Sequence, residues 1–243
     1  MTRDLWLHDF GQSPRAHLPR LVCFPHAGGS AGTYAAWAPV FAETTPVLAV
    51  RPPGREERWR EHPRGVREVA AAVADVLLAD RAPTILFGHS MGALVAWETA
   101  VLLRDAAPLA VVVSGTAAPH ITPTRPSVRP MTDDDLVDFL TGIGGIGQAH
   151  LRHPRLLADV LPGIRADLVA CDDYRHTGEP LPVPLVAFGG DADPLVTSGE
   201  LDAWTELSTV GTTRHTLPGG HFHHIDHPDR FLHRLAEELE QYR

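Results

Sequence analysis

The chain has 243 residues, of which 44% are hydrophobic and 21% charged, a balance typical of a globular protein with one sizeable core. Thirty acidic and 21 basic residues give a formal net charge of −9, which disfavours nucleic acid or an anionic membrane as a partner of the whole molecule. Every basic residue is an arginine, and the absence of lysine excludes Walker-type phosphate loops, lysine Schiff-base chemistry and Ser-x-x-Lys acylases.

Cysteine usage and the chain's first residues indicate the cellular compartment in which the protein works. Two cysteines, Cys23 and Cys171, do not make a secreted disulfide framework, and Cys23 sits in an apolar run as a small core residue would. The first residues lack an apolar signal region, and no run of about 18 apolar residues exists. We therefore expect a cytoplasmic protein without a membrane segment, and a monomer.

Apolar runs bounded by Gly and Pro alternate with helical patterns along the chain. The expected strands, in chain order, are 20–24, 47–50, 84–87, 110–114 and 185–188, with a weaker one at 213–217. The expected helices are 66–79, 93–104, 199–207 and 229–240. Several strand runs are continuously apolar, which is typical of strands covered on both faces. The pattern predicts an α/β fold with a mostly parallel central sheet flanked by helices.

Residues 119–180 do not fit this alternation. Proline-rich edges flank two helical sections, and the first section begins at Thr132, a predicted cap followed by three acidic residues. An insertion of this size between core strands is usually functional. We expect one domain over residues 1–243, with 119–180 as a helical insertion within it.

The sharpest motif is Gly-His-Ser-Met-Gly at 88–92, between an apolar strand and a helical pattern. This is G-x-S-x-G in the strand–turn–helix context that it requires. Ser90 would occupy strained backbone at the turn, and its neighbours two places away must lack side chains. The helix that follows directs free N–H groups at developing negative charge. Ser90 is therefore the predicted nucleophile.

A serine nucleophile needs a base, and catalytic groups of such folds gather at the carboxyl ends of the strands. The last expected strand runs into Gly-Gly-His at 219–221, so His221 is the predicted base. His223, His224 and His227 are interpreted as surface histidines or as neighbours of the site. A metal site is the rival interpretation, but the H-x-H-x-D-H ligand run fails by one residue, and we predict neither a metal nor a cofactor.

The acid that orients the base should end an earlier strand, and the strand at 185–188 offers two carboxylates. Asp193 is preferred because it fits G-x-x-D-x-x-V and lies one turn beyond the strand end. Asp191 is the alternative, with capping of the turn as its structural role. The predicted chain order, Ser90, Asp193, His221, is that of α/β-hydrolases.

Two backbone amides complete the predicted machinery as an oxyanion hole. Met91, directly after the nucleophile, supplies one N–H. The loop after the first strong strand contains Gly28 and Gly29, where small residues let the backbone approach a carbonyl oxygen, and Ala27 is the expected second donor. His26 in the same loop is either structural or part of the pocket.

Six arginines lie between residues 51 and 67, with four glutamates at positions 56, 57, 61 and 68. The arginines are Arg51, Arg55, Arg58, Arg60, Arg64 and Arg67. A solvated face with local ion pairs is the favoured interpretation for most of them. A patch that meets an acidic partner is the alternative for a few of them.

Taken together, these motifs resemble those of type II thioesterases, the free-standing editing hydrolases of polyketide and nonribosomal peptide synthesis. The resemblance covers nearly the whole chain. The segments that carry it are 24–29, 53–55 with Arg58, 88–93, 165–167, Tyr174, 189–194, Trp204 and 220–222.

The resemblance implies an α/β-hydrolase fold in which residues 119–180 form a helical lid over an acyl pocket, with Ser90, Asp193 and His221 as the triad. It also implies a function: hydrolysis of acyl or aminoacyl thioesters on the phosphopantetheine arm of an acyl or peptidyl carrier protein, through an acyl-serine intermediate. The alternatives are a small-molecule carboxylesterase or acyltransferase with the same triad, and a catalytically inert carrier-binding scaffold. Acyl preference, pathway and docking face do not follow from the sequence.

Overall fold

A computed structural model describes residues 3–11, 18–147, 152–176 and 179–242. Its seven-stranded sheet has the order β1-β3-β2-β4-β5-β6-β7, parallel except for β1, which pairs antiparallel with β3. The strands are β1 (Leu7–Asp9), β2 (Arg20–Phe24), β3 (Val47–Val50), β4 (Thr84–His89), β5 (Ala110–Ser114), β6 (Leu185–Gly190) and β7 (Thr212–Leu217). The predicted fold class, a mostly parallel α/β sheet, is confirmed.

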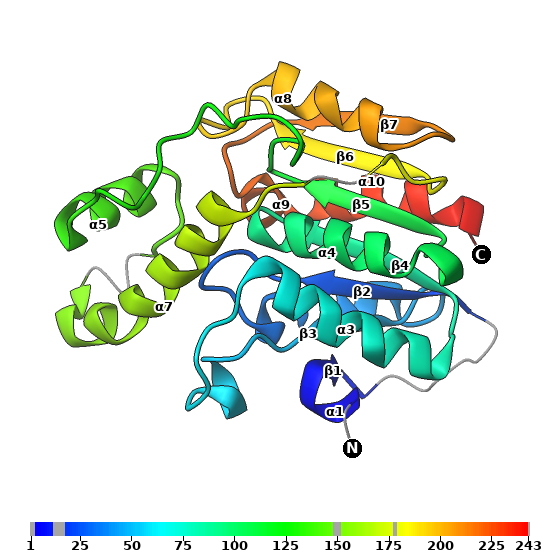
Figure 1. The fold of residues 1–243 in the computed structure, drawn as a ribbon, viewed down its shortest axis with the longest axis horizontal. Coiled ribbons are helices and arrows are strands. Elements are labelled where there is room, and N and C mark those ends of the chain that lie inside the picture. The colour runs from blue at the N-terminus through cyan, green and yellow to red at the C-terminus, as the bar shows by residue number, and fades with distance from the viewer. Residues whose placement is uncertain (1–2, 12–17, 148–151, 177–178, 243) are drawn as a thin grey trace.

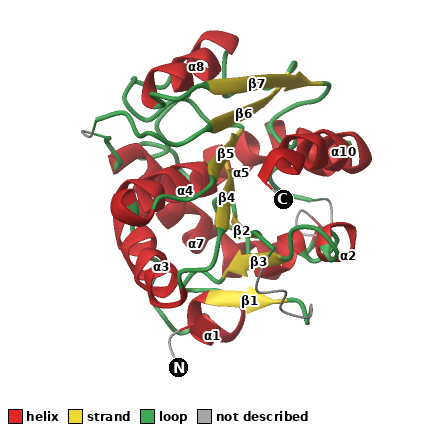
Figure 2. Cartoon of the chain, turned by 90° about the vertical axis from the view of Figure 1, so that its right-hand side faces the viewer, coloured by secondary structure: helices red, strands yellow, loops and turns green. Residues whose placement is uncertain are grey.

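Helices cover both faces of the sheet (Figure 2). The helices are α1 (Arg3–Trp6), α2 (Ala38–Phe41), α3 (Val66–Asp80), α4 (Met91–Leu102), α5 (Asp133–Gly142), α7 (Pro154–Asp173), α8 (Ser198–Asp202), α9 (His223–Asp226) and α10 (Pro228–Leu239). One face packs on α3 and α4 and the other on α2 and α10, so the central strands are buried on both sides. Burial of both faces explains why the sequences of the central strands are continuously apolar. Among the described residues, no helix is both long and apolar enough to cross a membrane.

The chain between β5 and β6 carries α5 and α7 beyond the carboxyl ends of the parallel strands (Figure 1). The predicted cap is confirmed: Thr132 Oγ1 accepts a hydrogen bond from the Asp135 N–H at 3.2 Å, and Asp135 Oδ2 accepts one from the Thr132 N–H at 2.9 Å. The two helices share a small apolar cluster that includes Leu136, Leu140 and Leu161. Within the predicted insertion, residues 148–151 and 177–178 lie outside the described residues.

Short elements depart from the sequence-based expectation. The chain begins with α1 and β1, which are too short to show periodicity, and β1 pairs with β3 through the register of Leu7 with Val50. The helix expected at 199–207 is in fact α8, begun by a Thr197–Glu200 capping box, followed by a 3₁₀ turn at Ala203–Leu207. Trp204 is fully buried in that turn and donates its indole N–H to the Thr116 carbonyl, so tertiary packing sets the local geometry.

Candidate active site

Ser90 lies at the turn from β4 to α4, with φ 54° and ψ −119°. Its N–H donates to the Ser114 carbonyl of the neighbouring strand at 2.8 Å, which holds this strained backbone in place. A Cβ at Gly88 would lie 2.1 Å from the Gly92 carbonyl oxygen, and one at Gly92 would lie 2.0 Å from that of Phe24. The turn therefore requires both glycines, for the steric reason that the motif predicted.

His221 and Asp193 form a buried pair. The His221 Nδ1 lies 2.9 Å from Asp193 Oδ2, with 3% of the histidine side chain and none of the aspartate side chain exposed. An ionised carboxylate only accepts, so Nδ1 carries the proton of this bond and Nε2 is left to accept one. The Leu195 N–H donates to the other Asp193 oxygen at 2.8 Å and fixes the carboxylate.

Asp191, the alternative acid, faces another group. Its Oδ1 accepts the Gly219 N–H at 3.0 Å, so it holds the loop that leads to His221 rather than the imidazole. The sequence assigned it a capping role within its own turn, whereas the structure places its contact 28 residues away. Of the two candidate carboxylates, the structure brings Asp193 to the base.

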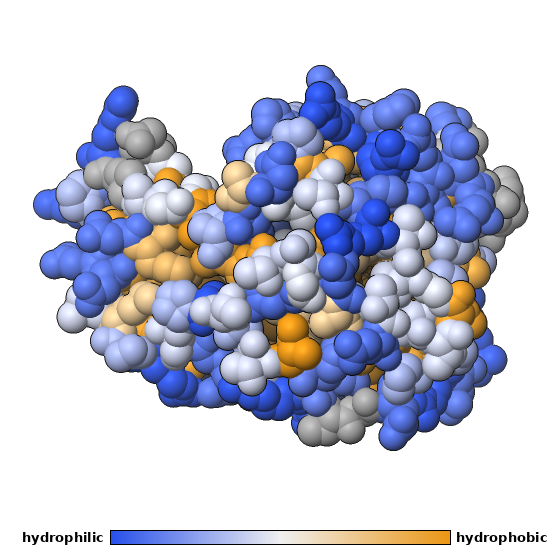
Figure 3. Space-filling model, turned by 90° about the horizontal axis from the view of Figure 1, so that it is seen from above, coloured by the Kyte–Doolittle hydropathy of each residue, from blue (hydrophilic) through white to orange (hydrophobic). Residues whose placement is uncertain are grey.

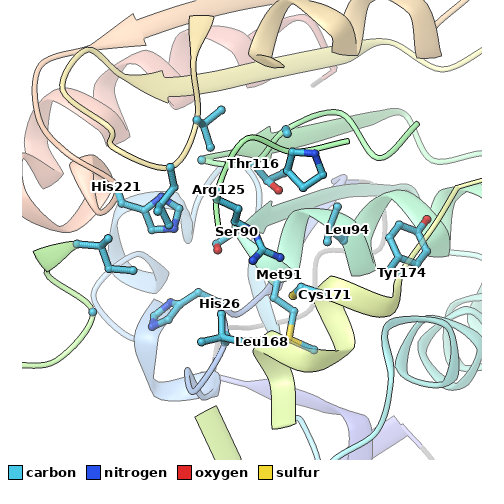
Figure 4. Close-up of a pocket in the computed structure, with 18 of the residues that line it drawn as sticks. His26, Ser90, Met91, Leu94, Thr116, Arg125, Leu168, Cys171, Tyr174 and His221 are labelled. Atoms are coloured by element: carbon cyan, nitrogen blue, oxygen red, sulfur yellow. The ribbon is translucent and has the colours of Figure 1, made fainter. Parts of the chain in front are cut away.

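Ser90 and His221 line one pocket at the carboxyl ends of the strands (Figure 4). The Ser90 hydroxyl lies on the side of the pocket where the His221 ring stands. Ala27 and Met91, the two expected oxyanion donors, also line it, and Met91 is the first residue of α4. The geometry thus collects a hydroxyl, an oriented imidazole and a helix N-terminus around one cavity, the set that acyl transfer through a serine requires.

The remainder of the pocket wall is mostly apolar. Residues from α4, α5 and α7 supply it, among them Leu94, Phe139, Leu140 and Leu168. Seen from above, apolar side chains gather where the surface is hollowed at the insertion's end of the molecule (Figure 3). A wall of this kind suits an acyl chain.

A chain of hydrogen bonds behind the nucleophile was missed by the sequence analysis. The Ser114 Oγ lies 3.1 Å from His89 Nδ1 and 3.2 Å from His223 Nε2, and the His223 Nδ1 lies 3.3 Å from the Gly220 carbonyl oxygen. A carbonyl only accepts, so His223 donates from Nδ1, accepts the Ser114 hydroxyl at Nε2, and leaves that oxygen to accept from His89. The chain joins the strand before Ser90 to the loop before His221. The pairing of β4 with β5 places His89 opposite Ser114, and the segment after β7 brings His223 to them.

His223 and His224 are not surface histidines. They are 0% and 2% exposed, so that interpretation is wrong for both and holds only for His227, which is exposed. The side chains belong to α9, a single turn that packs its first residues inward against His89, with a ring-centroid distance of 4.0 Å from His89 to His224. They are neighbours of the site, the other alternative from the sequence.

Burial lowers the pKa of these histidines. Desolvation lowers the pKa of His89 and His224 well below the usual value, and neighbouring imidazoles add to the effect. His26 lines the pocket, and desolvation, with His221 and Arg55 near it, lowers its pKa to about 4. These three rings are therefore neutral at pH 7.

Two of the clustered arginines are not on a solvated face. Arg58 is 4% exposed, stacks 3.9 Å above the Trp6 ring, and binds Glu61 and the Arg51 carbonyl. Arg55 pairs with the buried carboxylate of Asp167 on α7. These two are exceptions to the solvated face expected for most of the cluster, because a guanidinium buries readily when its donors are satisfied.

Arg125 and Cys171 also line the pocket, and nothing in the sequence pattern pointed to either. Arg125 is held by Asp172 at 2.8 Å, and burial raises the pKa of the Cys171 thiol to about 12, so the thiol stays protonated. Among the described residues, no group of three or more His, Cys, Asp or Glu side chains can hold a metal ion.

The sheet order, the strained serine turn and the Asp–His pair at the strand ends define an α/β-hydrolase. The family model described as a thioesterase domain matches residues 19–239, and the chain belongs to this family. It is therefore a hydrolase that acts on thioesters.

Named relatives agree with this assignment. The gramicidin S biosynthesis protein GrsT of Aneurinibacillus migulanus is 32% identical over 84% of this chain and 82% of its own length. The type II thioesterase BorB from the borrelidin biosynthetic cluster superposes with a TM-score of 0.87 at 37% identity, covering 98% of each chain. The thioesterase RedJ of the prodiginine pathway in Streptomyces coelicolor gives 0.84 at 36% identity, covering 93% of this chain and 96% of its own.

Proposed function

We propose that this protein removes acyl or aminoacyl groups from the phosphopantetheine arm of an acyl or peptidyl carrier protein, through an acyl-serine intermediate. One observation carries the catalytic part: Ser90, on strained backbone at the head of α4, faces the same pocket as an imidazole that Asp193 orients. The relatives named for gramicidin S, borrelidin and prodiginine biosynthesis support the carrier-bound substrate.

The proposed reaction has two halves. His221 Nε2 takes the Ser90 proton as Oγ attacks the thioester carbonyl, and the amides of Met91 and Ala27 stabilise the oxyanion. The C–S bond then breaks, and His221 returns the proton to the departing thiolate. Water, activated by the same imidazole, hydrolyses the acyl-serine and restores the hydroxyl.

Asp193 acts through His221. Its carboxylate keeps the Nδ1–H tautomer and stabilises the imidazolium that forms in each half-reaction. In this proposal residues 119–180 are the lid of a single domain, because α5 and α7 supply apolar pocket wall beside Ser90. A cytoplasmic location and a monomeric state stay predictions.

The test is mass spectrometry of a panel of acyl carrier proteins before and after incubation, with oxygen esters of matched chain length alongside. The wild type should deacylate the carriers faster than the matched esters, and Ser90→Ala should remove turnover while its circular dichroism spectrum stays unchanged. A fluorophosphonate probe should label the wild type and not Ser90→Ala. Faster cleavage of the oxygen esters would favour the carboxylesterase alternative, and a wild type that is neither labelled nor active would favour the inert scaffold.

A further inference from the structure

Asp167 is a buried carboxylate, 3% exposed, on the face of α7 toward the body of the protein. Its Oδ2 accepts the Gly28 N–H at 2.8 Å and also binds the Arg55 guanidinium. These partners come from the turns that follow β2 and β3. One side-chain oxygen therefore ties three segments that lie far apart in the sequence.

Gly28 directly follows Ala27, the proposed second oxyanion donor. The turn is closed on itself by the Gly29 N–H, which donates to the His26 carbonyl at 2.8 Å, and Gly28 has a φ of +78°. A hydrogen bond from the Gly28 N–H therefore sets the rotation of the Ala27–Gly28 peptide. An error in that rotation would turn the adjacent Ala27 N–H away from the oxyanion.

The same helix also limits the turn sterically. Ile164 lies one turn before Asp167 on α7, and its Cγ1 would lie 2.6 Å from a Cβ added at Gly28. The turn thus meets α7 by one hydrogen bond and by close contact. Movement of this part of α7 would move the turn with it.

Arg55 neutralises the charge of Asp167, whose hydrogen bond with the Gly28 N–H is the anchor of the turn. A lone carboxylate one residue from the oxyanion site would oppose the negative charge that develops there. Burial raises the pKa of Asp167, while the Arg55 charge and the Gly28 amide act in the opposite direction. Since the guanidinium neutralises the carboxylate, the anchor can hold the turn without repelling the oxyanion.

We propose that Asp167 is a positioning residue for the reaction: from the insertion, it holds the oxyanion-hole turn in its working geometry through the Gly28 N–H, with Arg55 as its counter-ion. This rests on the proposed function. Asp167 touches no reacting atom, so its effect should appear in transition-state stabilisation and not in substrate binding.

The experiment compares Asp167→Ala and Asp167→Asn with the wild type, using butyryl N-acetylcysteamine thioester as substrate and butylboronic acid as a tetrahedral-adduct probe. Loss of one oxyanion donor costs about 10²–10³-fold in kcat in such sites. A misplaced donor should cost part of this, so Asp167→Ala should lose about 10–100-fold in kcat. KM should stay within about threefold, and affinity for the boronic acid should fall in parallel with kcat. Asp167→Asn keeps an oxygen that accepts the Gly28 N–H and should recover most of the loss.

The matched control is Asp173→Asn on the same helix. Asp173 pairs with Arg129 at the surface and is 58% exposed, so this variant should retain wild-type kcat and boronic acid affinity. Urea unfolding of each variant checks that the folded fraction is unchanged. Should Asp167→Ala fail to fold, Arg55→Gln removes the counter-ion of the same oxygen and should lower kcat without raising KM.

Three results would overturn the inference. The first is a folded Asp167→Ala whose kcat is within twofold of the wild-type value. The second is an Asp167→Ala with a raised KM and an unchanged kcat, the result expected if Asp167 only tethers the lid. The third is an Asp167→Asn that is as impaired as Asp167→Ala. Failure of the proposed function looks different. In that case the wild type itself neither turns over the thioester nor reacts with a fluorophosphonate.

Discussion

Replacement of His224 by phenylalanine should make the protein less sensitive to acid. The His224 ring is 2% exposed, stands within 6 Å of the His89 and Phe231 ring centroids, and has no hydrogen-bond partner at either nitrogen among the described residues. Burial holds its pKa well below the ordinary value. The unfolded chain therefore binds a proton between pH 7.5 and 5.5 that the folded chain does not.

The sign and size follow from proton linkage. Because the unfolded state binds more protons, the free energy of unfolding falls as pH falls through the unfolded value of about 6.5. Between pH 7.5 and 5.5 one such histidine removes about 1.4 kcal/mol. His89 has the same direction and cause, so the pair removes about 3 kcal/mol, a large part of a typical stability of about 5–15 kcal/mol.

The assay is urea unfolding of the wild type and His224→Phe at pH 7.5 and 5.5. His89 and His224 together should cost the wild type about 3 kcal/mol of unfolding free energy on acidification, and the variant should lose about 1.4 kcal/mol less than the wild type. At pH 7.5 the variant should be equal to or more stable than wild type, since two unpartnered buried nitrogens are removed. When the pH-dependent change in unfolding free energy of the variant is subtracted from that of the wild type, the contributions of titratable groups common to both proteins cancel.

His233→Gln is the control, because this histidine is on the surface of α10 with 78% of its side chain exposed. Its Nε2 lies 3.2 Å from Glu237, and since an exposed pair of this kind contributes about 0.2–1 kcal/mol, its removal should change the acid response by less than His224→Phe does. A His224→Phe that loses as much stability on acidification as the wild type would refute the reasoning.

Two further outcomes are expected. Gly92→Ala should abolish fluorophosphonate labelling and give little folded protein on expression, since its Cβ would lie 2.0 Å from the Phe24 carbonyl oxygen; normal labelling would contradict the steric account of the turn. Ser114→Ala should lower the free energy of unfolding by about 1–3 kcal/mol, because His89 and His223 each lose a buried partner; a urea midpoint equal to wild type would contradict the hydrogen-bond chain.

The long elements were predictable because their signals are local. The strands β2, β3 and β5 begin and end where the apolar runs do, and the Thr132 cap follows from its own four residues. The signal of the G-x-S-x-G turn is also local, because a Cβ at either glycine would clash with backbone atoms of the same turn or of the neighbouring strand. By contrast, β1 and α9 are too short to show a period, so only their packing reveals them.

What the sequence by itself determined is the set of reactive groups and the order in which the strands deliver them: a serine, an acid and a histidine at strand ends. Tertiary structure decided which acid meets the imidazole. Asp191 and Asp193 follow the end of β6 by one and three residues, and only the folded chain shows that Asp193 reaches His221 while Asp191 binds the Gly219 N–H. Tertiary structure also decided that Asp167 and Arg55 meet beneath Gly28, and that Ser114 lies between two histidines. Contacts between residues 25 to 139 positions apart leave no periodic trace, because they depend on how helices and strands pack and not on the neighbours of either residue along the chain.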